Sequence, residues 1–182
     1  MDEQKNPTAR TLHSGQYLRL CREGHWEYVE RHTCRGAVMI LPLTAANEVI
    51  LVEQYRVPLH ASVIEWPAGL VGDLESHRQE ASAVCAQREL LEETGYHAAR
   101  LEPVFQGPVS AGLSSEQIEI FVALDLTQIH AGGGEPGEGI TVHRVPLATI
   151  DNWLATQAAT GKLIDVKLAA GLYWLGHVCN ID

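Results

Sequence analysis

Residues 80–96 decide the fold of this chain, and they read Glu80-Ala81-Ser82-Ala83-Val84-Cys85-Ala86-Gln87-Arg88-Glu89-Leu90-Leu91-Glu92-Glu93-Thr94-Gly95-Tyr96. Apolar side chains recur at the spacing of one helical face, at Ala83, Val84, Leu90 and Leu91. Gly95 follows them, where a helix C-terminus favours a residue that tolerates positive φ. Upstream, Ser76 with Gln79 three residues later has the pattern of a capping box. The sequence therefore predicts a helix that begins near Ser76 and ends at about Thr94.

Glu89, Glu92 and Glu93 form an acidic face on this helix, because residues three and four apart lie on the same side. Their mutual repulsion costs roughly a few tenths of a kcal/mol for each like-charged pair. Their place in the last helical turn also opposes the helix dipole, which favours Lys or Arg there. One interpretation is a solvated acidic face that is neutralised by Arg88 and water. The other is a face that binds a cation.

The segment before the helix favours the cation. Pro67-Ala68-Gly69 breaks the backbone and can bring carbonyl oxygens close to the acidic face. Carboxylates, carbonyl oxygens and waters are the ligands that Mg²⁺ and Mn²⁺ prefer. The sequence therefore predicts a site for Mg²⁺, with Mn²⁺ as the alternative.

The rest of the chain predicts an α+β fold, a mixed sheet flanked by helices. Alternating and β-branched stretches predict strands at Tyr17–Leu20, Trp26–Glu30, Ala37–Leu43, Glu48–Glu53, Val63–Trp66, Leu101–Phe105, Ile118–Leu124 and Thr141–Pro146. Helical periodicity predicts Ala148–Ala159 and Asp165–Leu175. Gly-rich loops are expected at 107–117 and 131–139. The second loop lacks a following Lys-Ser/Thr pair, so it is not a P-loop.

Composition narrows the classes of function. The chain has 182 residues, of which 46% are hydrophobic, so one compact domain can form a core. The formal net charge of −10 disfavours a nucleic-acid partner, which requires a basic face. The N-terminus has no apolar signal core, no run approaches the ~18 apolar residues of a membrane span, and the four cysteines form no CxxC pair. We therefore expect a cytoplasmic protein with no membrane partner and with reduced thiols.

The motif from Arg88 to Tyr96 resembles the end of the Nudix box, G-x5-E-x7-R-E-U-x-E-E-x-G-U, where U is a bulky apolar residue. Glu80 stands eight residues before Arg88 and matches the box glutamate. The leading glycine does not match, because residue 74 is Leu; the nearest equivalent is Gly69. This departure is interpreted as a five-residue insertion, which a surface loop tolerates at little cost.

The resemblance covers roughly residues 15–175 and is specific to the ADP-ribose pyrophosphatase branch. It rests on four stretches of sequence, Trp26-Glu27-Tyr28-Val29, Gly36-Ala37-Val38, Val52-Glu53-Gln54-Tyr55-Arg56 and Glu65-Trp66-Pro67-Ala68-Gly69. It implies an α/β/α sandwich with an N-terminal β-segment, in a homodimer. The chain is accordingly divided into a disordered tail (1–10), a β-segment for dimerisation (11–35) and a Nudix hydrolase domain (36–178).

The resemblance also implies roles on the helix. Glu89 and Glu93 are expected to bind the metal ions directly, Glu92 to assist them, and the carbonyl of Ala68 to be a further ligand. Glu80 is expected to support the metal site from behind the direct ligands. Arg88 is either a catalytic residue or an arginine that only pairs with helix carboxylates.

Glu116 is the candidate general base. It ends the stretch Ser110-Ala111-Gly112-Leu113-Ser114-Ser115-Glu116, which is similar to the catalytic loop of the branch. A flexible loop that contains glycine can close over a substrate. The alternatives are a solvated loop glutamate, or a base at Glu119 instead.

Five residues are candidates for binding substrate: Arg56, Trp26, Glu27, Tyr28 and Glu65. Arg56 ends a strand and has a planar fork suited to phosphate, although a surface salt bridge is nearly as plausible. The aromatic side chains of Trp26 and Tyr28 can stack on a base. For them, packing in the core or at an interface is an equally good interpretation.

Together these features predict Mg²⁺-dependent hydrolysis of the diphosphate of a nucleotide-sugar, such as ADP-ribose. The alternatives are a Nudix hydrolase for another nucleoside diphosphate derivative, or a Nudix-fold sensor that binds nucleotide-sugars without cutting them. ADP-ribose-specific relatives typically carry Pro 15 residues after the box, where this chain has Ala111. A catalytic loop without that proline is freer, so the sequence predicts activity that is not confined to ADP-ribose.

Overall fold

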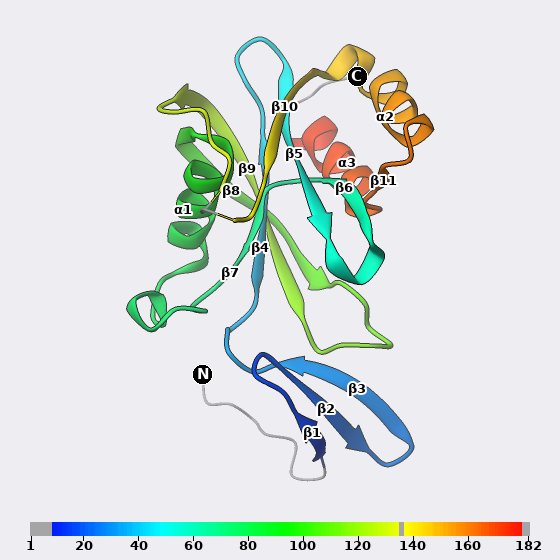
Figure 1. The fold of residues 1–182 in the computed structure, drawn as a ribbon. Helices are drawn as coiled ribbons and strands as arrows, with labels where there is room; N and C mark the ends of the chain where they lie inside the picture. The colour runs from blue at the N-terminus through cyan, green and yellow to red at the C-terminus, as the bar shows by residue number, and fades with distance from the viewer. Residues whose placement is uncertain (1–8, 135–136, 180–182) are drawn as a thin grey trace.

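The computed structural model describes residues 9–134 and 137–179, and its strands form three sheets (Figure 1). The N-terminal sheet has the order β1 (Arg10–Ser14), β2 (Leu18–Glu23), β3 (Trp26–Arg31). The second sheet has the order β10 (Thr141–Pro146), β5 (Glu48–Arg56), β6 (Ala61–Glu65), β11 (Leu163–Ile164). The third has the order β7 (Ala68–Leu70), β4 (Ala37–Pro42), β9 (Gln117–Gln128), β8 (Tyr96–Pro108). The helices are α1 (Ser82–Thr94), α2 (Ile150–Ala159) and α3 (Lys167–Cys179).

Strand β4 separates two hydrophobic cores, because its side chains alternate between the two faces of its sheet. Val38 and Ile40 pack on one face in a cluster that includes Cys85 and Leu90 of α1. Met39 and Leu41, which alternate with them along the strand, belong to the cluster on the other face, which includes Leu175 of α3. Burying a side chain such as Leu90, which is 0% exposed, stabilises the fold by roughly 1.5–3 kcal/mol.

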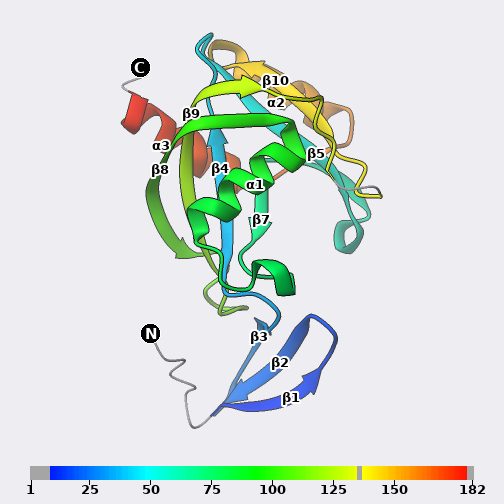
Figure 2. The same cartoon turned by 90° about the vertical axis from the view of Figure 1, so that its left-hand side faces the viewer.

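The helices accordingly cover opposite faces of the strands. Figure 1 shows α1 on one side of the two larger sheets and α2 and α3 on the other, and Figure 2 shows α1 lying across β4, β7 and β8. β4 and β9 run parallel, whereas β7 and β8 pair antiparallel with their neighbours. This arrangement confirms the predicted mixed α/β/α sandwich. None of the described helices is long and apolar enough to cross a membrane.

The N-terminal sheet lies beside the sandwich rather than in it (Figure 1). β2 and β3 confirm the two strands that were predicted in this segment, whereas β1 was not predicted. β1 begins at Arg10, the last residue of the predicted tail, and residues 1–8 lie outside the described residues. The division of the chain at residues 11–35 and 36–178 remains a prediction.

The predicted start of α1 is wrong. Glu75–His77 form a short 3₁₀ helix, and α1 begins only at Ser82, with Ala81 as an N-cap that makes no side-chain cap bond. The segment before α1 is instead fixed by Glu80, whose carboxylate accepts a hydrogen bond from the Gly72 N–H at 3.3 Å. The predicted end is correct: Gly95 has φ 77°, and its N–H donates to the Leu91 carbonyl at 2.8 Å.

One further prediction on local structure was wrong, and another was correct but too short. Ala68–Leu70 is not a break but strand β7, which pairs antiparallel with β4. The strand predicted at Leu101–Phe105 is much longer, because β8 extends over 13 residues against the 12 residues of β9. In both cases the partner strand stabilises an extended backbone that the local sequence alone does not favour.

Candidate metal and catalytic site

Glu93 is held where α1 meets β5 and β7. The residue is 7% exposed, and its two carboxylate oxygens accept hydrogen bonds from the Ala68 N–H at 3.1 Å and from Gln54 Nε2 at 3.3 Å. Burial raises the pKa of Glu93 to about 8, despite the opposing effect of the Ala68 N–H and with a contribution from nearby Glu89. The protein therefore holds a carboxylate in a place where its negative charge is poorly compensated.

Glu89 lies against β7 one helical turn earlier. A Cβ added to Gly69 would lie 2.0 Å from Glu89 Cδ, so this glycine leaves the space that the carboxylate occupies. The Glu89 side chain is 14% exposed, and burial raises its pKa to about 7, against the lowering effect of Arg88 and with the aid of Glu92. Glu93 is thus buried and Glu89 partly buried on one face of the helix, beside the backbone of Ala68 and Gly69.

This donor set fits a divalent cation. Two carboxylates that are costly to ionise together become favourable beside a double positive charge, and oxygen donors are the ligands that Mg²⁺ and Mn²⁺ take. Among the described residues, no group of three Asp, Glu, His or Cys side chains is already arranged to hold a metal. The fit therefore rests on the pair Glu89 and Glu93 together with backbone oxygens and water.

Arg88 ties together the remaining carboxylates of the helix. Its guanidinium contacts Glu80 at 3.1 Å, Glu89 at 2.8 Å and Glu92 at 2.9 Å. Burial alone would raise the pKa of Glu80, but the hydrogen bonds from Arg88 and the Gly72 N–H outweigh it and hold that pKa below its usual range. The structure shows the pairing role that the sequence left open for Arg88, and a catalytic role remains a prediction.

Gly69→Ala is expected to displace Glu89 and to lower metal-dependent turnover by about 10²-fold, the typical cost of a misplacement of ~1 Å at a site. The backbone of Gly69 is not in the positive-φ region, so the substitution introduces the clash with Glu89 without backbone strain. Steady-state kinetics together with thermal unfolding tests this expectation. Unchanged kcat in a folded Gly69→Ala protein would show that Glu89 does not need its present position.

Glu93→Gln is expected to stabilise the metal-free protein at alkaline pH. The ordinary pKa of 4.5 applies to the unfolded chain, whereas the folded value is about 8. At pH values between these two pKa values, the folded state binds more protons than the unfolded state. The stability that protonated Glu93 provides is therefore fully present below the unfolded pKa and is lost as pH rises through the folded pKa. Glutamine removes that loss, which we place at the order of a few kcal/mol.

Thermal unfolding in the presence of a chelator measures this effect. The Tm advantage of Glu93→Gln over the wild type should grow from about pH 5 to about pH 9, by roughly 2–4 °C for each kcal/mol in a domain of this size. A Tm difference that is the same at both pH values would contradict the buried, raised-pKa carboxylate.

Arg56 and Glu65 meet at the ends of β5 and β6. Arg56 Nε lies 2.6 Å from Glu65 Oε2, and Arg56 is also close enough to Glu93 to lower its pKa. Burial raises the pKa of Glu65, against the effect of Arg56 and with a contribution from Asp165. The pair lines a cleft of about 500 Å³ whose walls include Leu59. Arg56 therefore forms the salt bridge that was the alternative to phosphate binding, and its predicted role in binding substrate remains a prediction.

Trp26, Glu27 and Tyr28 lie in β3, on the N-terminal sheet. Trp26 is 57% exposed, and it lines a cavity of about 510 Å³ with Tyr28 and Gly112. Glu27 is exposed and is not among the residues that line this cavity. The structure thus brings the two aromatic residues to the predicted catalytic loop but not to Glu89 or Glu93.

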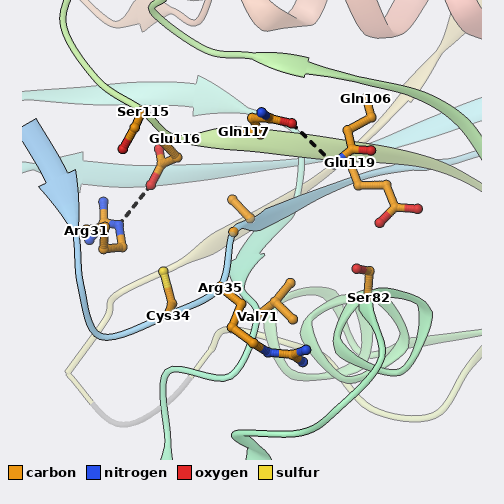
Figure 3. A pocket seen from close by; sticks show the side chains of 12 residues that line it. Arg31, Cys34, Arg35, Val71, Ser82, Gln106, Ser115, Glu116, Gln117 and Glu119 are labelled. Atoms are coloured by element: carbon orange, nitrogen blue, oxygen red, sulfur yellow. Dashed lines mark hydrogen bonds and ion pairs between the residues drawn. The ribbon is translucent and has the colours of Figure 1, made fainter. Parts of the chain in front are cut away.

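Glu116 and Glu119 share another cavity, of about 450 Å³, which Figure 3 shows from close by. Arg31 Nε contacts Glu116 Oε1 at 2.9 Å. This cavity is also lined by Ser82, the first residue of α1, but not by Glu89, Glu92 or Glu93. The candidate base therefore lies toward the beginning of the helix, whereas the expected metal ligands lie toward its end.

Glu119 lies on the face of the third sheet that α1 covers. Val38 pairs with Gly69 on one side and with Glu119 on the other, so these three residues form a row across the sheet. Strands are about 4.8 Å apart, which places Glu119 roughly 10 Å from Gly69 and the adjoining Glu89. The structure leaves Glu116 and Glu119 as alternative bases.

Two residues of the site were missed from the sequence. Gln54 lies within a stretch that carried the family resemblance, but nothing indicated that its side chain faces Glu93. Arg31 gave no signal, because its partner Glu116 is 85 residues away in the chain. Both contacts depend on which strands become neighbours.

The chain resembles known proteins both in its sequence and in its fold. The model of the NUDIX domain family matches residues 33–163. The chain is 38% identical over 99 residues to the methanol dehydrogenase activator of Bacillus methanolicus (54% of this chain, 51% of the relative) and 36% identical over 92 residues to the ADP-ribose pyrophosphatase of Bacillus subtilis (50% and 47%). The chain thus matches about half the length of these two relatives.

A longer match exists to the GDP-mannose pyrophosphatase of Escherichia coli K12. It is 32% identical over 148 residues, which cover 77% of this chain and 72% of the relative. A solved structure described as an ADP compounds hydrolase has a TM-score of 0.73, with 22% identity over 94% of this chain and 91% of that one. The structural likeness concerns the fold alone.

Proposed function

Since the chain belongs to the NUDIX domain family, we propose that it is a pyrophosphohydrolase that splits the diphosphate of nucleoside diphosphate sugars with the help of Mg²⁺, or of Mn²⁺. The products would be a nucleoside monophosphate and a sugar phosphate. One observation carries the proposal: buried Glu93 and partly buried Glu89 lie together beside β7, with raised pKa values that a divalent cation would lower. A sensor without catalysis would have no use for such costly carboxylates.

The protein's own groups would set up the reaction in three ways. Glu89, Glu93 and the Ala68 backbone would hold the metal, while Arg88 fixes Glu92 and Glu80 around them. The bound metal would neutralise the diphosphate and lower the pKa of an attacking water. Arg56 would bind a phosphate oxygen, for which its guanidinium is well suited, in competition with Glu65.

Glu116 is the proposed general base, and Glu119 is its alternative. Either carboxylate can accept a proton from the attacking water only within hydrogen-bond reach of it. Trp26 and Tyr28 are proposed to stack on the nucleobase in the cavity that they share with Gly112. Two further residues are proposed to contact the substrate: Glu27, which lies between Trp26 and Tyr28 in β3, and Glu65, which lines the cleft with Arg56.

The substrate range is proposed to be broad. The names of the relatives include both ADP-ribose and GDP-mannose, and Gly112 at the loop tip has open space where a Cβ would be. Although the loop is bonded to β3 at its C-terminal end, the tip at residues 111–113 is exposed and can adapt to different sugars. The proposed range therefore includes ADP-ribose, ADP-glucose and GDP-mannose.

A substrate panel tests this range. We expect kcat/KM values with Mg²⁺ for ADP-ribose, ADP-glucose, GDP-mannose and UDP-glucose to lie within ~10³ of one another, which corresponds to ~4 kcal/mol of discrimination. A stronger preference for ADP-ribose would contradict the broad range. Absence of metal-dependent cleavage of every member would contradict the proposed function itself.

We further propose that the protein is a homodimer with two-fold symmetry, formed through residues 11–35. Five large hydrophobic residues of the N-terminal segment are exposed: Leu12, Tyr17, Leu18, Leu20 and Trp26. A three-stranded sheet with such a surface is stabilised by packing on a second copy, which also covers its edge. Multi-angle light scattering should give twice the chain mass, and a stable, active monomer at micromolar concentration would rule the dimer out.

The proposed setting is the cytoplasm, without nucleic-acid partners. Cys21, Cys34 and Cys85 are free thiols, which suits a reducing compartment. The net charge of −10 would repel a phosphate backbone in the absence of a metal.

A further inference from the structure

The loop that carries Glu116 is an extension of the N-terminal sheet. The Val29 N–H donates to the Leu113 carbonyl at 2.8 Å, and the Ser115 N–H donates to the Val29 carbonyl at 3.2 Å. Val29 and Ser114 also form a parallel β-bridge. Residues 113–115 therefore lie along β3 and are joined to it by an isolated bridge at Ser114, where the sequence had indicated only a free loop.

The side chain of Arg31 continues this connection to the carboxylate itself. Arg31 lies at the end of β3, two residues beyond Val29, and its Nε contacts Glu116 Oε1 at 2.9 Å. Figure 3 shows the two side chains pointing toward one another in the shared cavity. The side chains are 32% and 23% exposed, so water screens the pair only in part. β3 thus holds both the backbone and the carboxylate of this segment.

Apart from the ion pair with Arg31, Glu116 is held by its backbone: its N–H donates to Ser114 Oγ at 3.2 Å, and its carbonyl accepts from the Val109 N–H at 3.3 Å. The loop tip before it is exposed, and a Cβ added to Gly112 would find open space, whereas Glu119 is fixed by its pairing with Val38 inside the third sheet. A glutamate side chain without a partner occupies several rotamers, and ordering it costs up to ~2 kcal/mol. A guanidinium that orders the carboxylate in advance removes most of that cost from the reaction.

We propose that Arg31 is a positioning residue for Glu116, and that β3 sets the place of the general base in the active site. The proposal rests on the proposed function, in which Glu116 accepts a proton from the attacking water. It gives the N-terminal sheet a part in catalysis: the sheet is required for turnover, although it provides none of the expected metal ligands.

A double-mutant cycle tests the proposal, with Arg31→Ala, Arg31→Lys, Glu116→Gln and Arg31→Ala/Glu116→Gln. Steady-state kinetics on ADP-ribose with Mg²⁺ gives kcat and KM for each, and thermal unfolding checks the fold. Arg22→Ala is the matched control, because Arg22 is an exposed arginine of β2 in the same sheet and its Nε donates to the Gly24 carbonyl.

Arg31→Ala should lower kcat by roughly 10–10²-fold, the range expected for a misplaced group, and should change KM much less. Arg31→Lys should recover part of kcat, since it restores the positive charge. In the Glu116→Gln background, Arg31→Ala should have little further effect, because the carboxylate that it positions is gone. Arg22→Ala should leave kcat unchanged.

Three results would overturn the proposal. In the first, Arg31→Ala lowers kcat by the same factor with and without Glu116, so that Arg31 acts on another group. In the second, Arg31→Ala leaves kcat unchanged or raises it, so that the ion pair is neutral or inhibitory. In the third, Glu119→Gln abolishes turnover while Glu116→Gln does not. The proposed function fails by a different result, a wild-type protein that cleaves no diphosphate sugar with metal.

Discussion

Glu93→Gln is expected to lower the metal-dependent kcat of this protein by ~10³-fold or more, equivalent to ~4 kcal/mol of transition-state stabilisation. An amide keeps the shape of the side chain but provides neither the charge nor the two equivalent oxygens that a divalent cation requires. The Ala68 N–H, which now donates to one oxygen of Glu93, can donate to the amide oxygen of glutamine, and Gln54 can turn its amide so that its own oxygen accepts from the new NH2 group. The loss should therefore affect catalysis without unfolding the protein.

A matched pair of variants separates the metal site from a general effect of lost charge. Glu89→Gln should behave like Glu93→Gln, because both carboxylates lie against β7. Glu102→Gln removes a glutamate whose side chain is 41% exposed and pairs with Arg100 on β8, and it should retain wild-type kcat. Near-normal Mg²⁺-dependent activity in both Glu89→Gln and Glu93→Gln would contradict the assignment of α1 as the metal helix.

The second large effect is expected at Glu116. Replacing this residue with Gln should lower kcat by ~10²–10⁴-fold, the range for a general base, with a smaller effect on substrate binding. Metal affinity, measured by Mn²⁺ titration with EPR detection, should stay close to that of the wild type and well above that of Glu93→Gln. The carboxylates of α1 do not line the cavity that Glu116 lines, which is why the two functions should separate.

Glu119→Gln decides between the two candidate bases. Glu119 projects from β9 on the face that α1 covers, in the same row as Gly69. A fully active Glu116→Gln protein together with an inactive Glu119→Gln protein would transfer the role of base to Glu119. The metal site would be unaffected by that transfer, because it rests on α1 and β7.

The sequence predicted helix α1 and its acidic face well because the relevant spacing is local. Carboxylates at 89, 92 and 93 lie on one face of any α-helix, and Gly95 marks its end through its positive φ of 77°. The unbroken run of apolar residues in β4 likewise favours a strand that is buried on both faces. Such features depend on a few consecutive residues, so neighbouring strands are not needed to infer them.

What the sequence could not predict depends on tertiary contacts. Ser76 and Gln79 match a capping box, yet Glu80 binds Arg88 and the Gly72 N–H, and α1 starts only after this contact. Gly69 was interpreted as a breaker, whereas its lack of a side chain makes room for Glu89. In both cases the residues make tertiary contacts in the folded chain that their local sequence pattern does not indicate.

The least predictable part of the site is the link between β3 and the Glu116 loop. Arg31 and Glu116 are 85 residues apart, and neither residue is in the Nudix box. The N-terminal sheet was expected to mediate dimerisation and to bring Trp26, Glu27 and Tyr28 to the substrate, and both roles remain predictions. The hydrogen bonds of Val29 to Leu113 and Ser115 give the sheet a further task, since they place the loop that carries the candidate base.

The central claim is that the carboxylates of α1 support metal-dependent cleavage within a diphosphate. Product analysis by ³¹P NMR tests it most directly, with ADP-ribose and Mg²⁺ for the wild type, for the wild type with EDTA, and for the Glu89→Gln/Glu93→Gln variant. The account predicts AMP and ribose 5-phosphate in equal amounts from the wild type with Mg²⁺ and negligible cleavage in the other two samples. Inorganic phosphate or ADP as the first product, or undiminished cleavage by the folded double variant, would contradict it.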